Sequence, residues 1–418
     1  MKVFKFGGAS IKDAESIKNV CEIIKKYGDK TLLVVVSASG KTTNALEDVT
    51  NAYFKDSGKA NDLLDGIKQN HFGICKELFD EGHKVYDDLQ NIFVELEWQL
   101  EEERLESYNY VYDQIVSVGE LLSTTIISHY LNEKGILSHW LDVRDVLKTD
   151  DTYREAKIDW EQTDRLIKSE VIPLLKDKIV ITQGFLGCTP ENCTTTLGRE
   201  GSDFTAAIFA NALDAESQSV WKDVPGILNG DPRIWEETEL IEDMTYHEAI
   251  EMTFYGAQVI HPKTIKPLQN KQIPLLVRSF IHPEDRGTKI YNPIKEPIYP
   301  PVRVIKYNQA LISLYTKDFS FIEEYVMSKI IKAFSKVNLK INMMQNAAIL
   351  FQAVVDNSTP KLEALVQDLE RFFDIQIDKN LTLLTVRHYN DGVIKKSIGE
   401  KNAILEQKRA TTYQALLK

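Results

Sequence analysis

The stretch Lys5–Ser10 (KFGGAS) decides how the chain begins to fold. Apolar Val3, Phe4 and Phe6 predict a short buried strand before the two glycines, and Ile11–Tyr27 has the spacing of an amphipathic helix after them. Glycine lets a backbone approach an anion closely, and free N–H groups at a helix start point toward it. Strand, Gly-Gly and helix therefore predict a phosphate cradle with a lysine at its edge. The alternative is an ordinary strand-to-helix turn beside a surface lysine.

A second glycine-rich block repeats this pattern. Ile179–Thr182 reads as a buried strand, and Gly198–Asp203 (GREGSD) precedes a helix predicted over Phe204–Leu213. Its serine and aspartate favour helix starts, and its arginine has a forked guanidinium that suits carboxylates. One cradle with lysine and one with arginine suit an enzyme that joins a nucleotide phosphate to a carboxylate substrate. Two structural glycine turns are the alternative.

A third block, Ser219–Arg233 (SVWKDVPGILNGDPR), combines a strand end with a long turn-rich loop. Val220 and Trp221 end the predicted strand, and aspartate, proline and glycine residues follow it. A loop of this kind at a sheet edge can hold a purine and a ribose. Taken alone, it is better read as a long surface loop.

Six segments in this order resemble aspartate kinases (aspartokinases) of the amino-acid kinase superfamily. They are KFGGAS, VVVSASGKTTNAL, SVGELLS, TTTLGREGSD, WKDVPGILNGDPR and YGAQVIHPKTI. Their order and spacing fit from residue 1 to about residue 290, and a weaker resemblance to ACT-type regulatory domains continues to about residue 388. The resemblance implies an α/β fold: a three-layer αβα kinase domain with a mainly parallel sheet, a ferredoxin-like βαββαβ ACT domain and a truncated second ACT unit.

The resemblance also implies roles for residues that match the family's motif positions. The implied catalytic residues are Lys5 and Asp203, with Asp203 orienting Lys5 and keeping it charged. The residues implied to bind the acceptor substrate are Ser39, Thr43, Glu120, Arg199 and Ser202. The residues implied to bind ATP are Lys5, Gly7, Gly8, Lys222, Asp223, Leu228, Arg233 and Gln258. No side chain is predicted to ligate a metal.

The implied reaction is ATP-dependent phosphorylation of the side-chain carboxylate of L-aspartate to 4-phospho-L-aspartate, the first step toward lysine, threonine and methionine. Phosphoryl transfer needs positioning and neutralisation of spreading negative charge, which Lys5, the two glycine amides and Mg²⁺ would supply. Arg199 would bind the substrate α-carboxylate and Glu120 its α-ammonium. Two alternatives stay open, namely Glu120 as a surface helix residue and Thr43 as a helix cap.

Four positions depart from the family's usual residues. Ala9 stands where threonine is usual, Glu200 replaces a glycine, Lys222 replaces a common threonine, and Gln258 stands in place of a nucleotide-contacting lysine. Glu200 brings a negative charge beside the substrate anion unless it points to solvent. Lys263 is near enough in sequence to substitute for the missing lysine. These departures concern the ATP contacts more than the reaction.

Three classes of function are compatible with these residues. The first is aspartate kinase, and the second is a kinase for another amino acid such as glutamate or acetylglutamate. The third is a catalytically inactive protein that binds an effector through its ACT-like region. The ACT-like tail and the pair Glu120 and Arg199 favour aspartate, and the presence of Lys5 and Asp203 argues against an inactive protein.

Composition limits the partners and the compartment. The chain has 418 residues, of which 43% are hydrophobic and 27% charged, as in a globular protein of two or three domains. A net charge of -12 without a basic patch argues against nucleic-acid binding. No apolar run approaches the roughly 20 residues of a membrane span, and no secretory signal precedes the first strand. Four cysteines fit a reducing cytosol, so we expect a cytoplasmic enzyme whose partners are L-aspartate and ATP.

The proline-rich stretch 292–301 (NPIKEPIYPP) marks the predicted end of the catalytic domain. The predicted domains are residues 1–296 (catalytic), 302–380 (ACT-like) and 381–418 (reduced second ACT-like unit). The catalytic domain is predicted to be largely helical over 44–134 and 151–176, with further strands at 31–36 and 138–143. The ACT-like elements are predicted as strand 310–315, helix 322–337, strands 340–344 and 349–355, helix 361–372 and strand 373–377.

The last segment is predicted to contain strands only. A strand is expected over 381–388, no helix over 390–399, and a closing hairpin from 402–408 and 411–417, so both helices of the second unit are missing. Exposed strand edges suggest a homodimer through the ACT-like region. Asn342, Ala347 and Ala348 stand where lysine-sensitive relatives tend to carry acidic or hydroxyl side chains. An effector ammonium would be desolvated there without a counter-charge, so we expect a role in assembly more than in tight feedback by lysine or threonine.

Overall fold

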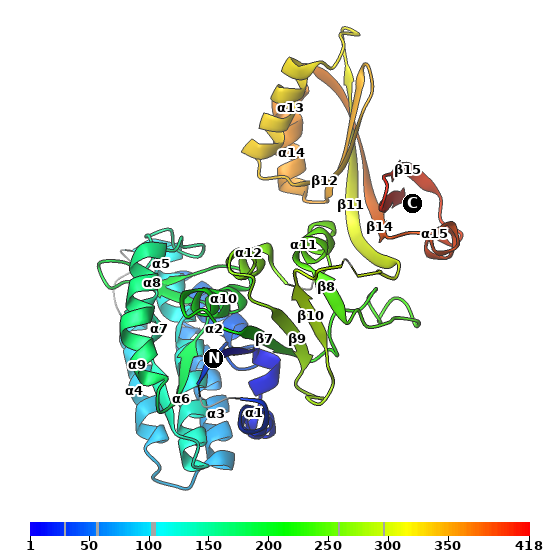
Figure 1. The fold of residues 1–418 in the computed structure, drawn as a ribbon. Helices are drawn as coiled ribbons and strands as arrows, with labels where there is room; N and C mark the ends of the chain where they lie inside the picture. Colours follow the sequence, from blue (N-terminus) through cyan, green and yellow to red (C-terminus); the bar gives the residue numbers. More distant parts are fainter. Residues whose placement is uncertain (29–30, 56–57, 102–105, 258–259, 296) are drawn as a thin grey trace. The chain divides into compact units, whose positions relative to one another are not determined.

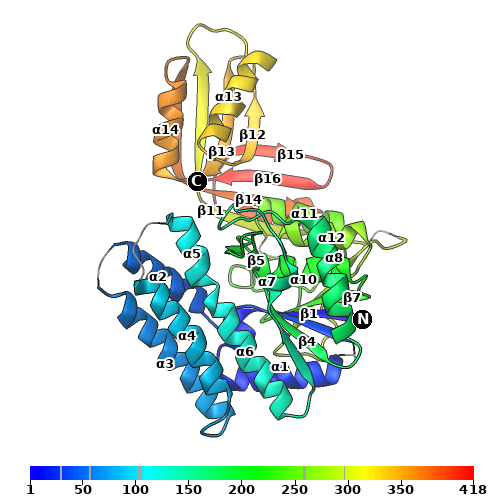
Figure 2. The ribbon, with the colours of Figure 1, turned by 90° about the vertical axis from the view of Figure 1, so that its left-hand side faces the viewer.

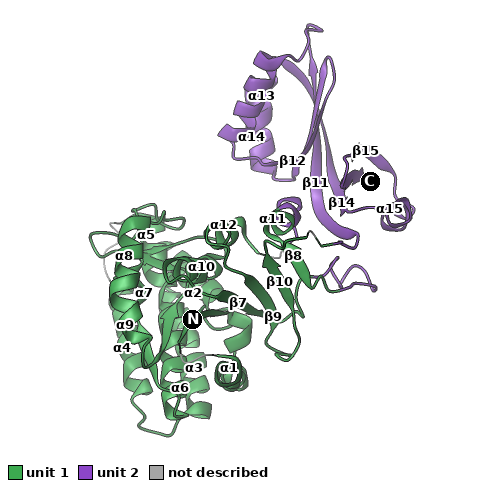
Figure 3. Ribbon diagram, viewed as in Figure 1, with its two compact units in different colours: residues 1–227, 240–250, 259–297 green, residues 228–239, 251–258, 298–418 purple. Residues whose placement is uncertain are grey.

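The computed structural model describes residues 1–28, 31–55, 58–101, 106–257, 260–295 and 297–418 (Figure 1). The chain divides into two compact units, which Figure 3 colours separately. Unit 1 comprises residues 1–227, 240–250 and 259–297, and unit 2 comprises residues 228–239, 251–258 and 298–418. The short stretches 228–239 and 251–258 thus belong to unit 2, although they precede residue 298 in the sequence. The domain limits expected from the sequence stay a prediction.

Unit 1 is built on an eight-stranded sheet with the order β3-β4-β2-β1-β7-β9-β10-β8. Its strands are β1 (Lys2–Phe6), β2 (Leu32–Val36), β3 (Ser138–Leu141), β4 (Ile179–Gln183), β7 (Ser217–Lys222), β8 (Asp243–Thr245), β9 (Leu275–Ser279) and β10 (Thr288–Tyr291). Neighbouring strands pair in parallel, except that β9 and β10 are antiparallel. The central strand β2 reads LLVVV and is buried throughout, as expected for a parallel sheet covered on both faces.

Helices cover both faces of this sheet and confirm the predicted three layers (Figure 2). α1 (Ala14–Tyr27) and α6 (Val118–Glu133) share a core with Phe4 and Phe6 of β1. α10 (Gly201–Ala212) packs against β1, β2 and β7, and α12 (Pro262–Asn270) packs beside α10. Because successive side chains of a strand point to opposite faces, Lys5 points toward α10 while its neighbours point toward α1 and α6.

The remaining helices of unit 1 confirm the helical prediction for residues 44–134. They are α2 (Thr42–Phe54), α3 (Ala60–Leu78), α4 (Val85–Glu101) and α5 (Tyr108–Val116). Shorter elements are the 3-10 turn η1 (Gly8–Ile11), α7 (Val143–Val146), α8 (Trp160–Leu166), the π-helical turn η2 (Ile167–Val171), α9 (Ile172–Leu174), β5 (Leu186–Cys188) and β6 (Thr194–Thr196). α11 (Tyr246–Tyr255) crosses the division between the units after Ile250.

In unit 1, the starts of α1 and α10 differ from the prediction. α1 begins at Ala14 rather than at Ile11, because the Asp13 side chain accepts a hydrogen bond from the Ser16 N–H and caps the helix there. α10 begins at Gly201 rather than at Phe204, because Glu200, with a left-handed φ of 55°, turns the chain into the helix directly before Gly201. Ser202 and Asp203 therefore lie in the first turn of α10, and both line the cavity described in the next subsection.

Unit 2 contains a six-stranded sheet with the order β12-β13-β11-β14-β16-β15, in which neighbours pair antiparallel. Its elements are β11 (Val302–Thr316), α13 (Glu324–Lys336), β12 (Ile341–Asn346), β13 (Leu350–Asp356), α14 (Thr359–Leu369), β14 (Phe373–Arg387), α15 (Asp391–Ile398), β15 (Ala403–Lys408) and β16 (Thr412–Leu417). The first six confirm the ferredoxin-like βαββαβ order. α13 and α14 share a core with Ile312, Leu314 and Phe351 of the sheet.

The predicted absence of a helix between residues 390 and 399 is wrong. α15 occupies this segment, since the Asn390 side chain accepts from the Val393 N–H at its start and Gly399 ends it with a φ of 61°. Val393, Ile394 and Ile398 pack against the neighbouring core of the sheet. The segment 381–418, predicted as a reduced second ACT-like unit, thus retains one helix. Its predicted closing hairpin is confirmed as β15 and β16.

Candidate active site

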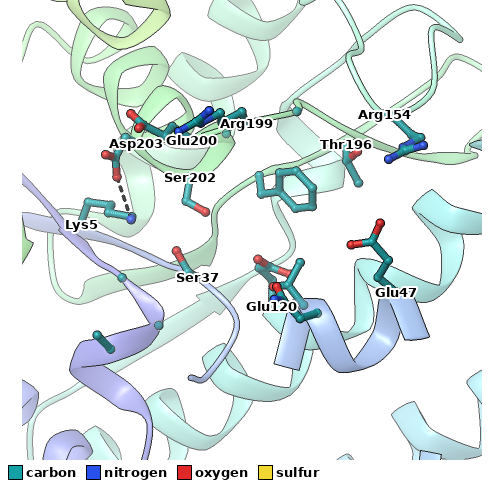
Figure 4. A pocket seen from close by; sticks show the side chains of 18 of the residues that line it. Lys5, Ser37, Glu47, Glu120, Arg154, Thr196, Arg199, Glu200, Ser202 and Asp203 are labelled. Atoms are coloured by element: carbon teal, nitrogen blue, oxygen red, sulfur yellow. Dashed lines mark ion pairs between the residues drawn. The ribbon is translucent and has the colours of Figure 1, made fainter. Parts of the chain in front are cut away.

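A cavity of about 910 Å³ opens in unit 1 where several parallel strands end (Figure 4). Segments that follow β1, β2, β4 and β7 line it with Gly7–Ser10, Ser37, Phe185 and Asp223, respectively. In open α/β sheets ligands bind beside the carboxyl ends of the strands. This cavity is therefore the candidate active site.

One end of the cavity holds a buried ion pair. The Lys5 Nζ lies 2.7 Å from Asp203 Oδ1, and the two side chains are only 11% and 4% exposed. The Lys222 Nζ lies 4.0 Å from the other oxygen, Oδ2. Burial alone would raise the pKa of Asp203, but the charges of Lys5 and Lys222 outweigh it and hold that pKa below its ordinary value. Asp203 thus stays ionised and orients two ammonium groups.

The two glycines after β1 bring this ion pair close to the backbone. A Cβ added to Gly7 would lie 3.4 Å from the Lys5 Nζ. A Cβ added to Gly8 would lie 2.7 Å from the Ala38 carbonyl oxygen and 2.8 Å from that of Gly40, a clash that backbone atoms cannot relieve. Gly8 is therefore required for the turn after β1 to pack against the turn after β2.

Glu120 presents an incompletely bonded carboxyl group to the cavity. It lies in the first turn of α6 and is 2% exposed, so the surface-residue alternative is wrong. Burial raises its pKa to about 8, although the Ala38 N–H and the charge of Lys5 act in the opposite direction. Among the described residues, no donor reaches its Oε2. A buried acidic oxygen without a donor is suited to an ammonium group of a ligand.

Arg199 is presented by an unusual turn at the start of α10. It lies between Gly198 and Glu200, whose φ angles are 73° and 55°. Left-handed backbone costs a residue with a side chain about 1–2 kcal/mol, so the turn must be held by its surroundings. A Cβ on Gly198 would lie 3.0 Å from the Arg154 carbonyl oxygen, which closes one side of the turn.

A buried carboxylate supports that side of the turn. Asp113 on α5 accepts hydrogen bonds from the Arg154 N–H at 2.9 Å, the Thr196 N–H at 2.8 Å and the Thr196 hydroxyl at 2.8 Å. Burial raises the pKa of Asp113 to about 6 against the lowering effect of these donors. Asp113 thus connects the 150–157 loop to β6, the strand that leads into the Arg199 turn.

The structure brings most of the predicted residues of unit 1 to this cavity. Lys5, Gly7, Gly8, Thr43, Glu120, Arg199, Ser202, Asp203, Lys222 and Asp223 line it. Ser39 is not among the lining residues, because its hydroxyl donates to the Ile11 carbonyl at 2.8 Å and holds a turn. Ser37 lines the cavity instead.

Three predicted nucleotide contacts are not among the residues of unit 1 that line this cavity. Leu228 and Arg233 belong to unit 2, and the Arg233 guanidinium pairs with Asp231 at 2.7 Å. Gln258 lies outside the described residues. Their role in binding ATP stays a prediction.

Ser37 and Arg154 are among the lining residues that the sequence reasoning missed. Ser37 directly follows β2, so the rule that ligands bind at carboxyl ends of parallel strands could have identified it. Arg154 lies in a polar loop with no periodicity, and its guanidinium stacks on the Tyr112 ring at 4.3 Å. Its placement depends on Asp113, 41 residues earlier, which no local pattern reveals.

Comparison with known proteins places this architecture in a family. The sequence model of the amino acid kinase family matches residues 1–279. The chain belongs to the amino acid kinase family. Its sequence is 29% identical over 391 residues to lysine-sensitive aspartokinase 3 of Escherichia coli. The alignment covers 92% of this chain and 86% of that protein. The sequence is also 32% identical over 313 residues to an aspartokinase of Chlamydia trachomatis, covering 74% and 69%, respectively.

A solved structure resembles the whole of this amino acid kinase. The crystal structure of Escherichia coli aspartokinase III in complex with aspartate and ADP superposes with a TM-score of 0.84 at 27% identity. The superposition covers 100% of this chain and 96% of that one. The resemblance to aspartokinases expected from the sequence is confirmed.

Proposed function

We propose that this amino acid kinase transfers the γ-phosphoryl group of ATP to the side-chain carboxylate of L-aspartate, giving 4-phospho-L-aspartate. One observation carries the proposal: a single cavity combines the buried Lys5–Asp203 pair with the open carboxyl oxygen of Glu120 and the guanidinium of Arg199. Cations beside glycines suit a phosphate donor, whereas a carboxyl and a guanidinium suit an acceptor with an ammonium and a carboxylate. The similar aspartokinase III was crystallised with aspartate and ADP.

The cavity residues have distinct roles in this reaction. Arg199 binds the α-carboxylate and Glu120 the α-ammonium, which leaves the side-chain carboxylate directed toward ATP. A carboxylate oxygen then forms a bond to the γ-phosphorus while the bond to the β,γ-bridging oxygen breaks, and ADP leaves. Lys5 offsets negative charge that spreads over the transferring group. Thr43 and Ser202 also line the cavity, and their hydroxyls would hydrogen-bond to the acceptor.

Mg²⁺ would arrive with ATP. Among the described residues, no three histidine, cysteine or acidic side chains form a cluster that would bind a metal. Mg²⁺ in kinases is usually bound by substrate phosphates, water and one or two carboxylates, so such a cluster is not needed. Asp223, which lines the cavity beside Lys222, is one carboxylate that would hold the ion. The ion would neutralise charge on the β- and γ-phosphates.

A panel of acceptors tests the proposed function. ADP formation is measured with aspartate, glutamate and N-acetylglutamate at equal concentrations, and turnover is expected with aspartate. N-acetylglutamate lacks the ammonium that would compensate Glu120, so it should be inactive. Equal or faster turnover with N-acetylglutamate, or none with any acceptor, would contradict the proposal.

The pH dependence of aspartate affinity should report on Glu120. Because the ammonium needs an ionised partner and the pKa of Glu120 is about 8 in the free protein, binding at lower pH must release its proton. The KM for aspartate should therefore fall by about tenfold for each pH unit as pH rises from 6.5 to 8, and then level off. Steady-state kinetics at saturating ATP measure this slope.

Glu120→Gln is the matched variant for that measurement. Its amide has nearly the same shape but does not titrate, so its KM for aspartate should be high and independent of pH. A wild-type KM that stays constant between pH 6.5 and 8 would show that Glu120 is not the ammonium partner.

The proposal for unit 2 is a role in homodimer assembly rather than in tight feedback. The Asn342 amide donates to Gln309 Oε1 at 2.8 Å and to Asp356 Oδ1 at 3.0 Å, and its oxygen accepts from the Lys306 Nζ at 2.9 Å. These bonds occupy the side chain that an effector ammonium would need. Lysine up to 1 mM is therefore expected to leave the rate at subsaturating aspartate unchanged. Clear inhibition below that concentration, or a monomer in sedimentation experiments, would count against this role.

A further inference from the structure

Glu200 combines a strained backbone with a long-range contact. Its φ of 55° and ψ of 27° lie in the left-handed region, which glycine adopts freely and other residues avoid. Its carbonyl accepts from the Asp203 and Phe204 N–H groups and so starts α10. A side chain at such a position persists only where the surroundings hold it in place.

The side chain of Glu200 supplies that hold. Its Oε2 accepts a hydrogen bond from the His261 backbone N–H at 2.8 Å. His261 is the N-cap of α12, where its Nδ1 accepts from the Lys263 N–H at 3.1 Å. A carboxylate that binds a backbone N–H at a helix start gains from both the hydrogen bond and the helix dipole. Glu200 therefore joins the starts of α10 and α12.

The same two helices are joined again at their other ends. The Asn211 amide donates to the Pro267 carbonyl at 2.7 Å, and the Lys271 Nζ donates to the Asn211 carbonyl at 2.7 Å. These contacts lie at the last turns of α10 and α12, away from the cavity. Of these contacts, the one between Glu200 and His261 is made by the residue next to Arg199. Figure 4 shows Arg199 and Glu200 together at the start of α10.

We propose that Glu200 is a positioning residue for Arg199, and that its contact with the His261 N–H sets the turn that presents the guanidinium to the acceptor. The proposal rests on the acceptor-binding role of Arg199 proposed above. Asp113 holds one side of the turn through Arg154, and Glu200 holds the other. The contact also directs the negative charge of Glu200 toward a helix start, which explains how a carboxylate is accommodated beside a site for an anionic substrate.

Three substitutions of Glu200 separate backbone strain from the contact. Glu200→Gly removes both the strain and the contact, Glu200→Ala keeps the strain without the contact, and Glu200→Gln keeps an acceptor oxygen without the charge. We expect the KM for aspartate to rise about tenfold in the glycine and alanine variants. The glutamine variant should recover most of this loss, while kcat and the KM for ATP should change less than twofold in all three.

Changes at His261 test the contact from the other partner. Residue 261 has a φ of -69°, which proline can adopt, so His261→Pro removes the backbone N–H while His261→Ala keeps it and loses only the side-chain cap. The proline variant should show a higher KM for aspartate than the alanine variant. In a Glu200→Gly background the two should be equal, because the acceptor is already absent.

The outcomes separate this proposal from the proposed function. Unchanged KM for aspartate in Glu200→Gly, with normal thermal melting, would overturn the positioning role and leave the kinase proposal intact. An equal rise in the KM values for aspartate and ATP would also overturn it, since that result indicates a general structural role. If the wild type prefers a different acceptor, the same comparison is made with that acceptor. No turnover with any acceptor would overturn both proposals.

Discussion

Lys5→Ala should lower kcat by at least about 10²–10³-fold, in line with the loss of one donor that stabilises a transition state. The Lys5 ammonium is buried, is fixed by Asp203 at 2.7 Å and lies beside the glycine turn of the cavity. A charge held in this way needs no reorganisation as negative charge develops on the transferring phosphoryl group. Water that fills the space left by the side chain would supply weaker and less ordered dipoles.

The fold should survive this substitution, because Lys222 remains near Asp203 at 4.0 Å and continues to compensate its charge. Circular dichroism and thermal melting check this point. Lys18→Ala is the matched control, since Lys18 is a partly exposed lysine of α1 that forms an ion pair with Glu15, one turn earlier in the same helix. A Lys5→Ala enzyme that keeps more than a tenth of the wild-type kcat would exclude the role given to Lys5.

Arg199→Lys should raise the KM for aspartate by about a hundredfold and change the KM for ATP less than twofold. An ammonium keeps the charge but cannot reproduce the two parallel hydrogen bonds of a guanidinium on a carboxylate, and losing hydrogen bonds to a charged group costs about 1.5–3 kcal/mol each. Initial rates measured against each substrate separately give both constants.

Arg154→Lys is the control for the Arg199 experiment. Arg154 is also a lining arginine, but its guanidinium stacks on Tyr112 and is assigned no acceptor contact. Its substitution should change the KM for aspartate much less. If Arg199→Lys weakens ATP as strongly as aspartate, Arg199 belongs to the nucleotide site instead.

The sequence predicted those parts of the site that depend on strand ends and glycine turns. Lys5 and Asp203 meet because β1 and the first turn of α10 face each other, an arrangement that the two glycine-rich blocks already indicated. The burial of Glu120 was harder to predict. α6 is buried on nearly all sides, so its sequence lacks the polar face that would have shown which side chains point inward.

Other features escaped prediction because they depend on contacts distant in sequence or on single residues. Ser37 and Ser39 are two positions apart in the sequence, and only the geometry of the turn after β2 decides that Ser37 lines the cavity while Ser39 does not. β14 continues through residues that read as two strands, because Asn380 takes a left-handed φ of 60° that lets the chain bulge without leaving the sheet. The contact between Glu200 and His261 spans 61 residues and has no local signature.

The segments 228–239 and 251–258 have a practical consequence for attempts to divide this protein. They precede the proline-rich stretch, yet they are packed within unit 2, where the Arg303 N–H donates to the Asn229 carbonyl at 2.8 Å and Arg387 pairs with Glu251 at 2.8 Å. A chain shortened at residue 297 would lose those partners and expose Trp235, which packs against the core of unit 2. Exchange of unit 2 with that of another protein would therefore require three grafted segments, because a single cut after residue 297 would separate these contacts.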